Sequence, residues 1–145
     1  MRTLLFSLLL TSSAYAVDFS LVLLDLRGDP ILDESVHGPR DPVTKQFTGP
    51  RACTMDEYKA KPNECDALTL GAAAANALLW NDPDDSKIDE KEKRRRGNLA
   101  DRVYHGGKFD LGVDDLALIK RLLSKLYGNL VVSRAIPLLD PATEK

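Results

Sequence analysis

Apolar residues recur at helical spacing through the second half of the chain, and this pattern predicts four helices. They are expected over residues 70 to about 80, from Ser86 to the glycines at 106 and 107, over 113–127, and over about 129–139. The third has the most regular apolar stripe, because Leu116, Ile119 and Leu123 fall on one helical face. Pro137 must end or kink the last helix.

The N-terminal part has a different pattern. Residues 17–25 alternate in the manner of a strand, with Phe19, Leu21 and Leu23 on one face, and a turn at residues 27–30 precedes a short return strand. Residues 33–66 form a long connection rich in proline, with one helical turn at 55–59 that Thr54 caps.

These elements predict an α+β fold, in which an N-terminal strand or β-hairpin packs beside a bundle of three to four α-helices. The small residues Ala72 to Ala75 and the kinked last helix are the expected contact surfaces for a partner. The expected core consists of Phe19, Leu21, Leu23, Leu78, Leu79, Leu99, Val103, Leu116, Ile119, Leu123, Leu126, Leu130 and Val131.

The first sixteen residues have the layout of a secretory signal peptide. Arg2 gives a positive start, residues 4–10 are mostly leucine, and Ala14-Tyr15-Ala16 forms a cleavage site before Val17. The alternative is a start codon assigned too far upstream, with the protein then in the host cytoplasm or in a virion. We therefore expect a leader at 1–16, one domain at 17–140 with its long loop at 33–66, and a flexible tail at 141–145.

The compartment decides what the two cysteines do. If the chain is exported to the periplasm or beyond, a disulfide between Cys53 and Cys65 is expected, and in the cytosol both remain thiols. The spacing is too wide for a CxxC motif, and with only two histidines in the chain we expect no metal site and no cofactor. The net charge of −2 excludes a basic field over the whole domain, and no integral membrane role is indicated.

Two charged segments could carry chemistry. The acidic segment 82–90 fails as a calcium loop, because Lys87 and Lys93 stand at the glycine and bidentate glutamate positions. The basic run Lys93, Arg94, Arg95 and Arg96 is a possible contact patch for nucleic acid, although nearby glutamates neutralise it in part. No nucleophile elbow, P-loop or dinucleotide motif is present, so we expect no catalytic residues and no enzyme.

Residues 68 to about 140 resemble a group of small phage and prophage proteins of unassigned function. The resemblance is carried by Leu68-Thr69-Leu70-Gly71, Ala74-Ala75-Asn76-Ala77-Leu78-Leu79, Arg95-Arg96-Gly97-Asn98-Leu99-Ala100, Asp115-Leu116-Ala117-Leu118-Ile119-Lys120 and Leu130-Val131-Val132. Such proteins commonly begin with a strand and a turn similar to residues 25–31 here. The long 33–66 connection, with both cysteines, and the leader depart from that pattern.

The resemblance implies a viral context and a fold but no site residues. Our leading hypothesis is a non-enzymatic accessory or virion-associated protein of phage or prophage origin that acts through protein–protein contacts. The alternatives are an exported bacterial protein with a Cys53–Cys65 disulfide, and an accessory protein that contacts nucleic acid through Arg94 to Arg96.

Overall fold

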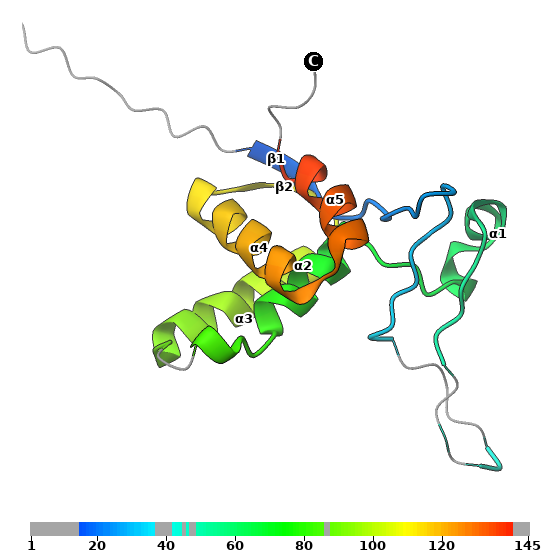
Figure 1. Cartoon of the computed structure of the whole chain (residues 1–145), viewed down its shortest axis with the longest axis horizontal. Helices are drawn as coiled ribbons and strands as arrows, with labels where there is room; N and C mark the ends of the chain where they lie inside the picture. The colour runs from blue at the N-terminus through cyan, green and yellow to red at the C-terminus, as the bar shows by residue number, and fades with distance from the viewer. Residues whose placement is uncertain (1–14, 37–41, 45, 47–48, 86–87, 141–145) are drawn as a thin grey trace, which may run out of the picture.

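The structure, a computed structural model, describes residues 15–36, 42–44, 46, 49–85 and 88–140. Its α+β architecture confirms the predicted fold class, with one pair of strands beside a set of packed helices (Figure 1). In chain order the elements are β1 (Tyr15–Asp18), α1 (Met55–Ala60), the 3-10 turn η1 (Pro62–Glu64), α2 (Leu70–Leu79), η2 (Pro83–Asp85), α3 (Glu90–Tyr104), β2 (Lys108–Leu111), α4 (Val113–Leu126) and α5 (Asn129–Leu138).

The two strands are far apart in sequence. β1 pairs antiparallel with β2, and Val17 stands opposite Phe109 in the register. The rings of Phe19 and Phe109 stack at 4.9 Å between centroids, which places an aromatic pair at the end of the sheet. The sequence did not predict β2, although Lys108 to Leu111 alternate between polar and apolar residues.

The strand predicted at residues 17–25 is wrong beyond Asp18. The chain continues instead as an irregular segment that makes isolated bridges, of Val22 with Thr69 and of Leu24 with Pro30. Asp25 closes the predicted turn, because its Oδ1 accepts hydrogen bonds from the amides of Arg27 and Asp29, at 2.8 and 3.0 Å. The segment runs beside the start of α2, since the Leu70 amide donates to the Leu21 carbonyl.

α2 is the central helix and packs against both α3 and α4 (Figure 1). Ala73 and Ala74 are fully buried, and Ala72 and Ala75 nearly so. The small side chains let neighbouring elements approach closely inside the domain. The expectation that residues 72–75 form a surface for a partner is therefore wrong.

The helix ends follow local sequence. Thr69 caps α2 by accepting from the Ala72 amide, and Asp89 caps α3 by accepting from the Glu92 amide. α3 therefore begins at Glu90, later than the predicted start at Ser86, which itself lies outside the described residues. α4 and α5 end at Leu126 and Leu138, within a residue of their predicted ends.

The core lies between β1, β2 and helices α2 to α5. The predicted residues that are buried are Phe19, Leu23, Leu78, Leu99, Val103, Leu116, Ile119 and Leu123, with Leu126 and Val131 partly buried at its edge. Three predictions are wrong, because Leu21, Leu79 and Leu130 are exposed by 40%, 66% and 38%. The core residues that the sequence did not predict are Val17, Leu68, Leu70, Ala72, Ala73, Ala74, Ala75, Ala77, Ala100, Leu111, Leu122, Ala135 and Leu139.

Residues 49–66 form a lobe that stands apart from the packed helices, at the right of Figure 1. We call it the disulfide lobe. Its helix α1 has the predicted Thr54 cap, in a reciprocal capping box with Glu57, but buries none of its own residues. Within the described ranges, no helix has the length and apolar character to cross a membrane.

Candidate functional site

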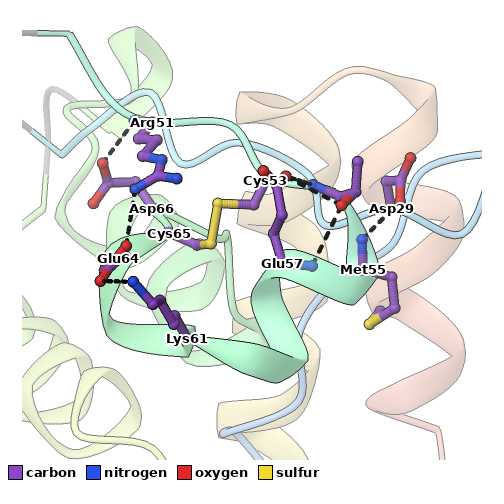
Figure 2. The surroundings of a disulfide bond; sticks show 10 residues. Asp29, Arg51, Cys53, Met55, Glu57, Lys61, Glu64, Cys65 and Asp66 are labelled. Carbon is purple, nitrogen blue, oxygen red and sulfur yellow. Dashed lines mark hydrogen bonds and ion pairs between the residues drawn. A yellow bond between two sulfur atoms is a disulfide. The ribbon is translucent and has the colours of Figure 1, made fainter.

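A disulfide joins Cys53 and Cys65 across the base of the disulfide lobe (Figure 2). The Cα atoms of the two cysteines are 5.8 Å apart, within the normal range for a disulfide. The bond closes a loop that contains α1 and η1. The pairing that the sequence allowed for an exported chain is therefore present.

Polar contacts within the lobe stabilise it, and contacts with Asp29 and Asp33 attach it to the rest of the domain. Just outside the disulfide, Arg51 and Asp66 bond to each other through their backbones, at 3.0 Å, and through the Asp66 carboxylate, at 2.7 Å (Figure 2). Asp29 accepts from the Met55 amide at 2.8 Å and so anchors the start of α1. Glu64 pairs with Lys61 and Arg51 at the far side of the loop. These contacts are exposed or half-buried, and α1 buries none of its own residues. The disulfide is therefore the main constraint on the conformation of the lobe.

The basic run lies on α3, and acidic side chains engage most of it. Arg94 pairs with Glu90 at 3.1 Å, and Arg95 pairs with both Glu92 and Asp115. Arg96 turns inward. Of the four predicted contact residues, Lys93 has no such pair among the described residues. The run therefore presents little unneutralised charge to a phosphate backbone.

Three charged residues in the described part of the chain are buried, namely Asp33, Asp82 and Arg96. Arg96 bonds to Asp85 at 2.5 Å, and Asp82 bonds to Lys125 at 2.5 Å. The hydrogen bond from Lys125 lowers the pKa of Asp82, and the same bond raises the pKa of Lys125. The first pair joins the α2–α3 connection to α3, and the second joins it to α4. Both pairs therefore have a structural role.

Asp33 differs from the other two buried charges. It is 5% exposed, and no described lysine, arginine or histidine lies within ion-pair distance. Its Oδ1 accepts from the amide and the hydroxyl of Ser35, at 3.0 and 2.5 Å. No described residue donates to its Oδ2. Every solvent-inaccessible side-chain nitrogen or oxygen among the described residues has a hydrogen-bond partner. Because Asp33 Oδ2 has no such partner, it must be accessible from the cleft that surrounds it.

Those surroundings are a cleft of about 530 Å³, which we call the Asp33 cleft. It lies between the segment 31–35, α2, and the adjoining ends of α4 and α5. Its volume falls within the range of roughly 300–1,000 Å³ that is typical of ligand sites. The lining residues are Ile31, Leu32, Asp33, Glu34, Ser35, Leu68, Asn76, Leu126, Tyr127 and Val131.

A chain of hydrogen bonds crosses this cleft. Asn76 of α2 donates through Nδ2 to the Ser35 hydroxyl and to the Tyr127 hydroxyl, both at 3.2 Å. Ser35 in turn donates to Asp33. Burial raises the pKa of Tyr127, opposed by the Asn76 hydrogen bond and assisted by the charge of Asp33. The phenol is therefore protonated at neutral pH and can donate a hydrogen bond.

Sequence reasoning missed this site because its members belong to no motif. Asp33 and Ser35 form an ordinary Asx turn, and Tyr127 follows the last residue of α4. One signal was available. Asn76 is the single polar side chain in the Leu70–Leu79 helix, where an amide needs a partner.

A second concavity, of about 360 Å³, lies between α2 and α3. Leu79 and Tyr104 line it with exposed fractions of 66% and 59%, and Asn76 and Asp101 add polar groups. It holds no buried charge, so it offers less chemical specificity than the Asp33 cleft. Among the described residues, no group of three or more potential ligands could hold a metal ion.

Comparisons of the chain with protein-family models, with curated proteins and with solved structures found no match.

Proposed function

We propose that this chain is a non-enzymatic accessory protein of phage or prophage origin that acts by binding a partner protein through the Asp33 cleft. One observation carries the proposal. A buried carboxylate without a counter-charge among the described residues lies in the largest of the described clefts. Burying a charge is unfavourable unless it is paired, and a cationic group of a partner would supply the missing pair.

The lining of the cleft supports binding rather than catalysis. Among the described lining residues Ser35 is the one aliphatic hydroxyl, and none is a histidine or lysine, the side chains that most often activate a serine. Asn76 and Tyr127 hold one another in place by a hydrogen bond. The set can orient a ligand, and its one hydroxyl–carboxylate contact, from Ser35 to Asp33, belongs to a local Asx turn.

The viral context rests on the resemblance of residues 68–140 to small phage and prophage proteins. Several cleft residues fall in that part of the chain, and Asn76 lies within one of the segments that carry the resemblance. The other half of the lining, including Asp33, comes from residues 31–35, at the start of the connection that departs from the pattern of such proteins. On the resemblance of the remaining half, the expected partner is a product of a neighbouring viral gene.

The test is a pull-down from cells that co-express the chain with each neighbouring gene product. The wild type should retain one product stoichiometrically, D33N should lose it, and the matched control D114N should keep it. Asp114 suits this control because it is exposed at the opposite end of α4 from the cleft. If size-exclusion chromatography shows a partner-free monomer in every pairing, the proposal fails.

We also propose export, because the Cys53–Cys65 disulfide favours an oxidising compartment. Cleavage at the predicted site before Val17 would remove Tyr15 and Ala16 from β1 and leave Val17 and Asp18 paired with β2. Mass spectrometry of the chain from the native host tests this. Export predicts an N-terminus at Val17 and the loss of two hydrogens, whereas an intact leader with two free thiols contradicts it.

A further inference from the structure

We infer that the Asp33 cleft binds an arginine side chain of the partner protein. This rests on the proposed function for the source of the arginine, but the chemistry is argued from the cleft alone. The missing element is a cation.

The charge of the lining is negative. Asp33 and Glu34 are both acids, and none of the described residues that line the cleft is basic. Asp82 and Arg96, the other buried charges in the described residues, each meet an opposite charge within 2.5 Å. Among the buried charges that the structure describes, Asp33 alone lacks a described counter-charge, and a bound cation would supply one.

The apolar walls suit the stem of a long cationic side chain. Four lining residues, from segment 31–35, the segment just before α2 and the α4–α5 corner, provide them: Ile31, Leu68, Leu126 and Val131. Arginine and lysine bury an aliphatic stem against such surface while the charged head reaches a polar group. A small inorganic cation would leave these walls unused, and the described residues assemble no set of metal ligands there.

The open acceptors favour arginine over lysine. Asp33 Oδ2 and Asn76 Oδ1 both lack a donor among the described residues, because Asn76 uses its Nδ2 toward Ser35 and Tyr127. A guanidinium has five N–H donors in a planar fork and can bond several acceptors at once. It is also more weakly hydrated than an ammonium, so its transfer into a half-enclosed cleft costs less.

The experiment uses the full chain and small probes, observed by ¹H–¹⁵N NMR. The probes are Nα-acetyl-arginine amide, its lysine analogue, and the citrulline analogue, which is an uncharged isostere of arginine. The arginine probe should shift the Asn76 side-chain amide and the Ser35 backbone amide in a saturable way. The lysine probe should bind more weakly, and the citrulline probe should cause no saturable shift.

Variants then locate the site. D33N should weaken binding of the arginine probe by about tenfold or more, while D114N should bind as the wild type does. The comparison of the arginine, lysine and citrulline probes uses only the wild type. A folding defect in D33N would therefore leave that test of the inference unaffected. Equal shifts from citrulline and arginine, tighter binding of lysine, or no saturable shift would each overturn it.

The outcomes also separate this inference from the proposed function. If a partner is captured in a manner that depends on Asp33 but the arginine probe does not bind, the function stands and the arginine assignment fails. If the probe binds at Asp33 but no neighbouring gene product is retained, the assignment stands and the proposed function fails.

Discussion

The carbonyl oxygen of Val103 lies 2.2 Å from the position that a Cβ atom at Gly71 would occupy. The Phe19 carbonyl lies 2.9 Å from the same point. At Gly71, α2 has no side chain, and the backbones of α3 and of the segment after β1 contact the helix there. This contact brings the N-terminal segment, α2 and α3 together, and it explains why a glycine stands in the first turn of a helix.

We expect G71A to destabilise the protein by about 3 kcal/mol or more, because the added methyl group meets backbone atoms that cannot rotate away. Urea denaturation followed by circular dichroism measures this. G97A is the matched control, since Gly97 lies inside α3 with open space around its Cβ position. It should stabilise by about 0.5–1 kcal/mol through helix propensity. Equal midpoints for the two variants would contradict the close approach.

We expect loss of the disulfide to loosen the disulfide lobe while the helical core persists. Replacing Cys53 and Cys65 by serine removes a constraint that contributes about 3 kcal/mol in the chain-entropy model. Because α1 buries no residues, hydrogen exchange of its amides should accelerate by about 100-fold. Exchange in α4, whose Ile119, Leu122 and Leu123 are fully buried, should change little. Equal acceleration in both helices would show that the lobe and the core unfold together.

The Asp82–Lys125 pair should give the domain a pH-dependent stability on both sides of neutrality. The lowered pKa of Asp82 contributes stability that is present above the usual aspartate value of about 3.9 and is lost as pH falls through the folded-state value. The raised pKa of Lys125 contributes stability below about 10.4 that is lost as pH rises through its folded-state value.

K125M should therefore lower stability at neutral pH, because it leaves Asp82 buried without its cation. Below pH 4 the difference from the wild type should shrink as Asp82 becomes protonated. Urea midpoints measured from pH 2.5 to 8 test this. K91M, at an exposed position on α3, serves as the control and should follow the wild type throughout. A K125M deficit that is the same at every pH would contradict the role of the pair.

Removing the Asn76 side chain should affect both stability and the ionisation of Tyr127. N76A loses two hydrogen bonds in the Asp33 cleft, and we expect a loss of about 1–2 kcal/mol. The pKa of Tyr127 should rise further, because the Asn76 amide favours the charged phenolate. NMR titration of the tyrosine ring signals measures this, with the exposed Tyr104 as an internal control. An unchanged Tyr127 titration would show that the hydrogen bond does not form in solution.

The sequence by itself determined the helices and most of their ends. Thr54 and Thr69 stand at the predicted N-caps, and the apolar spacing of α4 identified its buried face, because capping and periodicity depend on neighbours along the chain. The start of α3 is the exception, since Asp89 caps the helix in place of the predicted Ser86. The same local logic failed at Leu21 and Leu79. Leu21 lies in a segment with little regular strand pairing. Leu79 is the last residue of α2, and the elements that pack on this helix cover a different face.

The tertiary structure decided the strand pairing and the cleft. β1 and β2 pair across about 90 residues of sequence, and Asp33, Asn76 and Tyr127 come from three separated segments. No local pattern links such residues, since their proximity depends on how α2, α4 and α5 pack. The sequence showed that Asp33 and Asn76 are polar, but only the packing buried Asp33 away from every described cation.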